Sequence, residues 1–174
     1  NALTLAGVVS GVGGLTKSGP ADLILNGANT YFGNTALNVG KLIVGSNTAI
    51  GSGALNAAAG TTLDTNTAVT LGNQVNLAGA MNIGGSADLT LTGTVAGAGS
   101  LVKNGAANLN LNGTNTYVGG TTLNAGTVTV GNSSALGTGA LTVGGAATLD
   151  SSSPLASLAN AVVLNAALSV GGTQ

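Results

Sequence analysis

Residues 109–131 read Leu-Asn-Leu-Asn-Gly-Thr-Asn-Thr-Tyr-Val-Gly-Gly-Thr-Thr-Leu-Asn-Ala-Gly-Thr-Val-Thr-Val-Gly, and they carry most of the information about the fold. Apolar and polar residues alternate in short runs such as Leu109-Asn110-Leu111, and Gly or Asn-Gly follows these runs. Alternation with period two points successive side chains to opposite faces of a β-strand. Gly and Asn tolerate the positive φ of tight turns. The segment therefore predicts strands of about three to five residues joined by turns.

A second copy of this segment lies 86 residues earlier in the chain. Residues 3–64 align without gaps on residues 89–150 with 33 identities in 62 positions, and the alignment resumes after one inserted residue in the second copy. Internal repeats of this kind are typical of solenoids and related arrays. We expect the 174 residues to form one segment, 1–174, made of two tandem units, 3–88 and 89–174.

A finer period runs inside each unit. The strand-like runs begin at steps of 20, 19 and 21 residues, at Leu3, Leu23, Leu42 and Leu63 in the first unit and at Leu89, Leu109, Val128 and Leu149 in the second. Short strands, tight turns and such a step are what a β-solenoid requires. We therefore predict an all-β fold, a parallel β-helix of about 8 coils, with an apolar core and outward Thr, Asn and Ser ladders.

Two local patterns favour other structures. Three dipeptides are typical hairpin turns and would fit an antiparallel sandwich: Asn26-Gly27, Asn104-Gly105 and Asn112-Gly113. Residues 28–30 and 114–116, which follow two of these turns, do not alternate as hairpin strands do, so the solenoid is preferred. Residues 153–163 fit a capped helix with Pro at its first position. The matching residues 68–75 alternate like a strand and contain a Gly, so we predict no helix there.

The composition excludes several functional classes. Only 4% of the residues are charged, the net charge is −1, and the chain has no Cys or His. Nucleic-acid binding needs a basic surface, and thiolate, imidazole and most zinc chemistry needs Cys or His. No apolar run approaches the ~18 residues of a membrane-spanning helix. We predict no nucleic acid or nucleotide partner, no cofactor or metal, no transmembrane segment and no enzymatic activity.

The few charged residues are expected to be structural. Residues 11–17 resemble a phosphate-binding loop only weakly, because that loop needs Gly directly before its Lys and Thr16 stands there. We expect Lys17 and Lys103 to be solvated turn residues at matching points of two coils. The carboxylates are Asp22, Asp64, Asp88 and Asp150.

The functional alternative for these aspartates is a catalytic pair of carboxylates. Asp64 and Asp150 recur at one repeat position, which places them about four coils or ~20 Å apart along the rod. Paired carboxylates of glycosidases lie within ~10 Å of each other. We therefore expect turn residues that bond their own backbone, and no catalytic site.

Two further patterns could serve binding. Tyr31 and Tyr117 recur 86 residues apart and are expected to pack over a coil edge rather than to stack on sugars. Thr-x-Thr pairs could form an ice-binding face, but such a face needs a pair at one place in nearly every coil. The five pairs, which begin at residues 65, 90, 92, 114 and 127, do not follow the coil step.

Residues 23–45 and 109–131, with the preceding 11–17 and 97–103, resemble the passenger-associated transport repeat of bacterial autotransporters. The first copy departs from that pattern at Phe32 and Asn34. The resemblance implies a right-handed parallel β-helix in a passenger exported to the surface of a Gram-negative bacterium, and it implies no catalytic residues.

The resulting prediction is a structural stalk or fibre that supports translocation, surface display and adhesion to cells or matrix. We expect further coils or end-to-end stacking into filaments at the uncapped ends. The alternatives are an adhesin module that binds a glycan or host protein and, less favoured, a polysaccharide hydrolase or an ice-binding protein.

Overall fold

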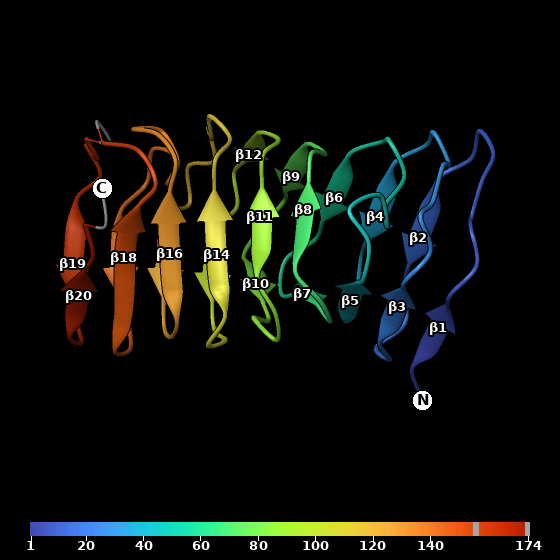
Figure 1. Cartoon of the computed structure of the whole chain (residues 1–174), viewed down its shortest axis with the longest axis horizontal. Helices are drawn as coiled ribbons and strands as arrows, with labels where there is room; N and C mark the ends of the chain where they lie inside the picture. The colour runs from blue at the N-terminus through green and yellow to red at the C-terminus, as the bar shows by residue number, and fades with distance from the viewer. Residues whose placement is uncertain (155–156, 173–174) are drawn as a thin grey trace.

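The computed structural model describes residues 1–154 and 157–172, and within them it consists of strands and turns without a helix. The strands form three parallel sheets that line the sides of a rod (Figure 1). Sheet A contains, in spatial order, β1 (Leu3–Leu5), β3 (Leu23–Leu25), β5 (Lys41–Val44), β7 (Thr62–Thr65), β10 (Met81–Ile83), β13 (Leu101–Lys103), β15 (Thr121–Leu123), β17 (Leu141–Val143) and β19 (Val162–Leu164). Sheet B contains β2 (Leu15–Lys17), β4 (Thr35–Leu37), β6 (Leu55–Ala57), β9 (Val75–Leu77) and β12 (Val95–Gly97). Sheet C contains β8 (Val69–Leu71), β11 (Leu89–Leu91), β14 (Asn108–Leu111), β16 (Thr127–Val130), β18 (Ala147–Ser151) and β20 (Leu168–Val170).

Each step along a sheet is one coil of the solenoid, and the coils follow the predicted spacing. Leu3 pairs with Leu23, Leu23 with Leu42 and Leu42 with Leu63, so the steps of 20, 19 and 21 residues are confirmed. Leu89, Leu109, Val128 and Leu149 pair in the same way in sheet C. The structure confirms an all-β solenoid of about eight turns, and its parallel ladders exclude the antiparallel sandwich.

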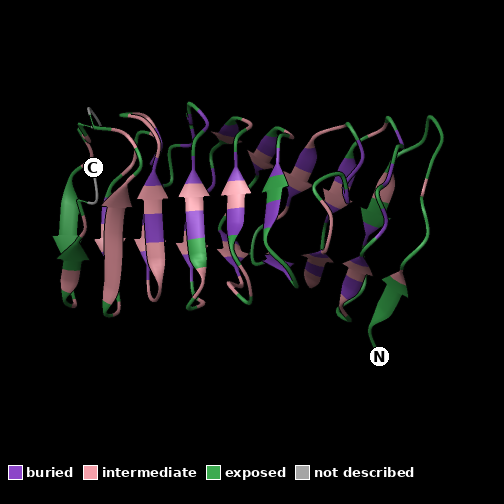
Figure 2. Ribbon diagram, viewed as in Figure 1, coloured by how far each residue is buried: buried purple, intermediate pink, exposed green. Residues whose placement is uncertain are grey.

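The core is a column of inward aliphatic side chains. In β3, Leu23 and Leu25 are buried while Ile24 between them is half-buried, and most inner strands repeat this alternation (Figure 2). Each buried side chain stacks on its register partner in the next coil, as Leu42 does on Leu63. Burial of these side chains is the main apolar contribution to stability.

The segment that fits a capped helix has no helix in its described part. Pro154 lies in a turn, and Val162 begins β19 in sheet A. Leu155, which the helical pattern includes, lies outside the described residues. Tertiary stacking on β17 therefore outweighs the local helical pattern at the C-terminal end of the segment.

The two copies of the repeat lie on different sides of the solenoid. β1 and β3 belong to sheet A, whereas their counterparts 86 residues later, β11 and β14, belong to sheet C. β2 belongs to sheet B, and its counterpart β13 belongs to sheet A. The expectation that equivalent residues occupy matching points of two coils is wrong, because 86 residues span four coils and one further side.

A long loop replaces one strand in several coils. Residues 26–34 and 45–54 cross the side on which sheet C begins only later, at β8. Residues 112–120 and 131–140 cross the side on which sheet B ends at β12. Coils with three strands therefore lie in the middle of the chain, between the two sets of loops (Figure 1).

Candidate functional site

The long loops share a buried asparagine that joins three successive coils. The Asn29 side chain accepts a hydrogen bond from Val9 N at 2.8 Å and donates to Ala49 O at 2.6 Å. These two partners lie 20 residues before and after it, in the neighbouring coils. A buried amide that is paired on both sides holds the loops together where no strand ladder runs.

The second copy repeats this arrangement on its own side of the solenoid. Asn115 Oδ1 accepts from Val95 N at 2.8 Å, and Asn115 Nδ2 donates to Ala135 O at 2.6 Å. Both asparagines are buried. The distances are the same as in the first copy, so the loop core does not depend on the side that it occupies.

Tyr31 and Tyr117 fill the interior of the same loops. Their hydroxyl groups share hydrogen bonds with Thr35 Oγ1 at 2.5 Å and with Thr121 Oγ1 at 2.6 Å. Burial raises the pKa of Tyr31 above its usual value and that of Tyr117 to about 12. The rings pack as expected, but the expectation that they lie over a coil edge is wrong, because both are buried inside the coil.

A glycine from the next coil closes each tyrosine site. Gly51 and Gly137 have φ values of +62° and +64°, where side chains are strained. A Cβ on either glycine would lie 2.4 Å from the carbonyl oxygen of Tyr31 or Tyr117. The Tyr and the Gly of the following coil therefore form one packing unit, which explains why both recur in the sequence.

The expectation that Lys17 and Lys103 are solvated is wrong. Their exposed fractions are 7% and 0%. Each Nζ donates to the carbonyl oxygen two residues later, of Gly19 or Gly105, and to a carbonyl of the next coil. The second bond is 3.0 Å to Val39 O and 3.4 Å to Ala125 O.

The burial of these lysines follows from the strand pattern. Lys103 stands two residues after the buried Leu101 in β13, so its side chain points inward. Its aliphatic stem fills core space while its ammonium group binds turn carbonyls. Desolvation lowers the pKa of Lys103, and the nearby charges of Asp88 and Asp64 act in the opposite direction.

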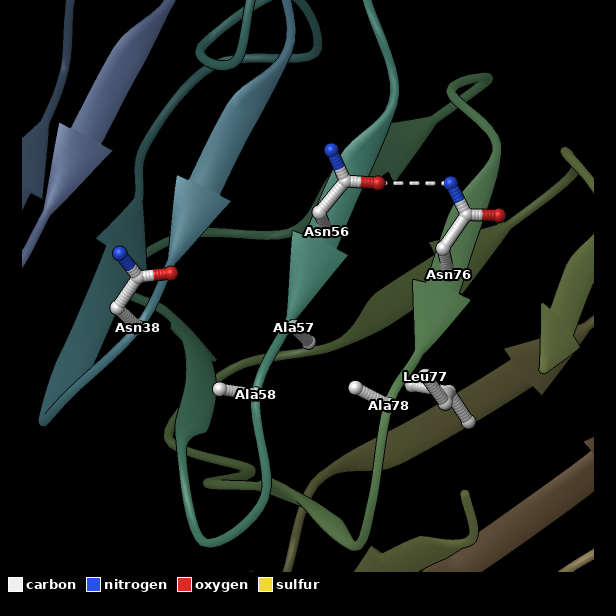
Figure 3. Close-up of a pocket in the computed structure, with 7 residues that line it drawn as sticks. All are labelled: Asn38, Asn56, Ala57, Ala58, Asn76, Leu77 and Ala78. Atoms are coloured by element: carbon white, nitrogen blue, oxygen red, sulfur yellow. Dashed lines mark hydrogen bonds between the residues drawn. The ribbon is translucent and has the colours of Figure 1, made fainter. Parts of the chain in front are cut away.

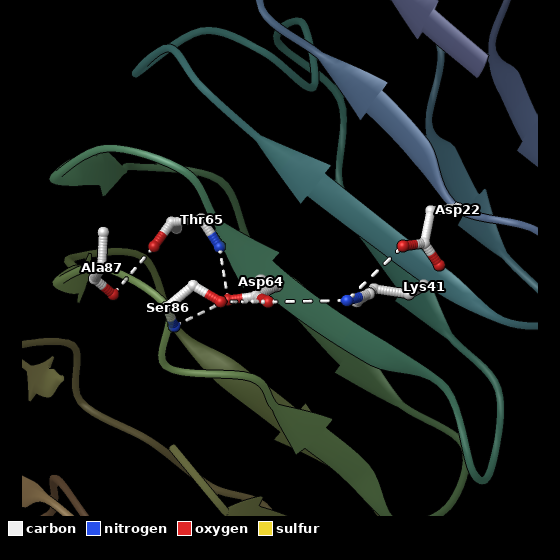
Figure 4. Close-up of polar contacts among 6 residues, drawn as sticks. All are labelled: Asp22, Lys41, Asp64, Thr65, Ser86 and Ala87. Carbon is white, nitrogen blue, oxygen red and sulfur yellow. Dashed lines mark hydrogen bonds and ion pairs between the residues drawn. The ribbon is translucent and has the colours of Figure 1, made fainter. Parts of the chain in front are cut away.

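The carboxylates act as structural hydrogen-bond acceptors. Asp64 is 4% exposed and lies in β7, so the expectation of a turn position is wrong for it. It accepts from Thr65 N at 2.9 Å and from Ser86 N and Ser86 Oγ in the next coil at 3.0 and 2.8 Å. Lys41 Nζ lies 3.5 Å from Asp22 Oδ2 and 3.9 Å from Asp64 Oδ2 (Figure 4). This cluster ties three neighbouring coils in sheet A.

The remaining carboxylates lie apart from that cluster. Asp88 accepts from Asn108 N of the next coil at 2.9 Å, and Asp150 accepts from Ser151 N at 2.8 Å. Asp64 belongs to sheet A and Asp150 to sheet C, so these two do not share even a side of the rod. Among the described residues no three His, Cys, Asp or Glu side chains gather as a metal site.

The phosphate-loop pattern also forms a different structure. Gly14 packs against the backbone of the next coil, where a Cβ would lie 2.4 Å from Asn34 O. Lys17 points inward to carbonyl oxygens rather than toward the glycines. The arrangement therefore lacks the lysine that a phosphate-binding loop directs at its ligand.

Outward amide and hydroxyl groups form the ladders predicted from the sequence. Asn76 Nδ2 donates to Asn56 Oδ1 at 2.7 Å on sheet B, and Asn124 Nδ2 donates to Asn104 Oδ1 at 2.7 Å. Beside the first pair lies a shallow hollow of about 320 Å³ (Figure 3). It is lined by Asn38, Asn56, Ala57, Ala58, Asn76, Leu77 and Ala78.

The Thr-x-Thr pairs do not form one face. Residues 127–129 lie in β16 of sheet C, whereas residues 114–116 lie in a loop on the side of sheet B. The regular plane of paired threonines that an ice-binding face needs is therefore not formed by these pairs. No helix among the described residues is long and apolar enough to cross a bilayer.

The fold and these contacts define a class: a repetitive β-solenoid in which each copy of the repeat has a buried core of Asn, Tyr and Gly shared by two successive long loops. The family described as Passenger-associated-transport-repeat matches residues 15–44 and 101–130. The chain therefore carries the passenger-associated-transport repeat twice, and the resemblance seen in the sequence is confirmed.

A curated relative points the same way. The chain is 58% identical over 36 residues to the Adhesin BmaC autotransporter of Brucella suis biovar 1 (strain 1330). The match covers 21% of this chain and 1% of the adhesin, so this chain spans only a small fraction of that relative. No solved structure matches the chain significantly.

Proposed function

We propose that this chain is a structural stalk segment of an autotransporter-type passenger, displayed at the surface of a Gram-negative bacterium. The observation that carries the proposal is the pair of passenger-associated-transport repeats, each built around a buried core that links successive coils. At ~4.8 Å per coil, about eight coils give a rod roughly 40 Å long. The segment acts by spacing and rigidity, and it needs no catalytic group.

Export is the second part of the proposal. Each coil contacts its neighbours through ladders and buried side chains, so folding propagates from one formed coil to the next. Propagation of this kind outside the cell would bias passage of the chain through an export pore without nucleotide hydrolysis. The support is the coil-to-coil contacts of Asn29 and Asn115, together with the repeat family.

The test places one charge in the core during export. Leu111 is buried in β14, and Asn110 beside it points outward. Leu111→Asp is expected to slow secretion of a parent autotransporter that carries the segment, whereas Asn110→Asp leaves secretion unchanged. Equal secretion of both variants and of the parent, measured by surface labelling, would contradict the proposed role in export.

Self-association is a further part of this function. The outermost described strands expose Leu3, Leu164 and Val170. Further coils of a longer chain, or a second copy stacked end to end, would cover these side chains and pair the strand edges. Size-exclusion chromatography with negative-stain imaging tests this, because filaments are expected at high concentration and a persistent monomer contradicts stacking of copies.

An adhesin module is the second candidate function. The relative's name and the neutral amide ladder beside Asn56 and Asn76 favour it, because amides pair well with hydroxyl-rich or peptide ligands. A glycan array and a binding screen against cell-surface and matrix proteins test it. Binding that disappears in the Asn56→Ala/Asn76→Ala variant would support this function over a purely mechanical one.

A further inference from the structure

The offset between the two repeats is not a whole number of coils. Four register steps lead from Leu3 through Leu23, Leu42 and Leu63 to Ile83 on the same side of the rod. Six further residues lead from Ile83 to Leu89, which begins β11 on the next side. The second copy therefore starts one side onward from the first.

The local structure of the repeat survives this change of side. The amide of Asn29 and that of Asn115 bridge neighbouring coils with equal distances, and Lys17 and Lys103 bind equivalent turn carbonyls. Asn73 donates to Gly51 O and Gly53 O, and its counterpart Asn160 donates to Gly137 O and Gly139 O. These contacts lie within one turn or join adjacent coils, so none requires a particular side.

We propose that the 86-residue unit, residues 3–88 and 89–174, is a screw module that the solenoid accepts on any of its three sides. Each copy adds four coils and one further side, so it turns the surface of the repeat to the next side of the rod. In a longer array of such units the motif would return to its first side at the fourth copy and at every third copy after it. The rotation of this surface around a stalk matters only if the proposed function holds. The packing of the unit on different sides of the rod does not depend on that function.

The module determines how a repeated surface meets a partner. Phe32 and Val118 occupy equivalent positions directly after the buried tyrosines and are 70% and 59% exposed. Phe32 lies in the loop on the side of sheet C, and Val118 lies in the loop on the side of sheet B. A partner that recognises this loop would bind one copy at a time, from different directions around the rod.

Two deletions test whether stability depends on removing a whole 86-residue unit or on removing a whole number of coils. The first variant lacks residues 15–100, so that Gly14 directly precedes Leu101. Leu3 then lies opposite Leu109, as it lies opposite Leu23 in the native chain. Val9 N likewise lies opposite Asn115, as it lies opposite Asn29 in the native chain. The second variant lacks residues 15–94, four coils, and keeps every remaining strand on its native side. It opposes Leu3 with Lys103 and Val9 with Leu109, which removes the amide bridge.

The first variant is expected to unfold cooperatively and to resist protease, and the second to melt at least roughly 10 °C lower. Equal melting temperatures, or a more stable second variant, would overturn the proposal. If both deletions fail to fold, insertions in the full chain decide it. A second copy of residues 15–100 after Ser100 should preserve the melting temperature, and a second copy of residues 21–100 should lower it; the reverse order refutes the module.

Discussion

The long-loop coils and the three-stranded coils hold one side of the rod by different means. In the middle of the chain, β8 and β11 cover that side with a backbone ladder and with alternating Val and Leu side chains. In the long-loop coils, a loop without a strand covers the same side, and buried side chains such as Asn29 and Tyr31 supply the hydrogen bonds that a ladder would make. A ladder tolerates many sequences, whereas these loops depend on a few specific residues.

Gly137→Ala is expected to have the largest effect on stability, because Gly137 lies in a long loop. The new Cβ would lie 2.4 Å from Tyr117 O at a φ of +64°. Left-handed backbone strain alone costs about 1–2 kcal/mol, and the clash brings the expected loss to roughly 4 kcal/mol. Gly72→Ala in a three-stranded coil meets only Thr92 Oγ1 at 3.7 Å and is the matched control. Denaturant unfolding measures both, and equal effects would contradict the dependence of the loop on this glycine.

Asn115→Ala is expected to destabilise the protein by about 3 kcal/mol, because Val95 N and Ala135 O both lose their buried partner. Asn110→Ala removes only an outward bond to Thr90 Oγ1 and should cost less than about 1 kcal/mol. Urea unfolding of the two variants compares a loop bridge with a strand ladder. A larger effect at Asn110 would show that the loop amide is dispensable.

Stability is expected to fall between pH 10 and about 12. Folding raises the pKa of Tyr117 from 10.0 to about 12, so its contribution is present below pH 10 and is lost as the pH rises through that window. Two pKa units correspond to about 3 kcal/mol. The lowered pKa of Lys103 acts oppositely below its usual value of 10.5, so stability rises as the pH approaches that value. Melting temperatures across pH 8–12 test this, with Tyr117→Phe as the control that should reduce the alkaline fall and leave the smaller part due to Tyr31.

The smallest effect is expected at the partly exposed Lys41. Lys41 is partly exposed beside Asp22 and Asp64, so Lys41→Met should change stability by less than about 1 kcal/mol.

Lys41 is also the most exposed of the three lysines, and trypsin should cut the folded chain there before Lys17 or Lys103. Early cleavage after Lys103 would show that its coil is frayed.

The strand positions could be predicted from the sequence because apolar and polar residues alternate in the strands of each coil. The steps from Leu3 to Leu63 appear in the structure as register partners. The burial of Lys17 could also have been predicted, since it follows Leu15 and Thr16 at an inward place of its strand. The charge suggested solvation, but the ammonium group binds the nearby carbonyl of Gly19 and the carbonyl of Val39 in the next coil, and the second of these leaves no local pattern.

The change of side had a signal in the sequence as well. The offset of 86 residues between the copies is not a multiple of the coil step of about 20 residues. The prediction that Asp64 and Asp150 lie on the same side, four coils apart, assumes that it is. The buried bridge of Asn29 could not be predicted, because its partners lie 20 residues away in loops without alternation. Contacts of that kind follow from the stacking of whole coils.

The second repeat lies one side onward from the first, and two spin-label distances test this change of side directly. The chain has no Cys, so paired cysteines can be introduced cleanly. Thr16 and Ala96 lie in one column of sheet B, four register steps apart, whereas Val102, the repeat equivalent of Thr16, lies in sheet A. The Thr16→Cys/Ala96→Cys pair should give about 19 Å, and the Thr16→Cys/Val102→Cys pair should give a longer distance. A shorter distance for the second pair would place equivalent residues on the same side of the rod and contradict the change of side.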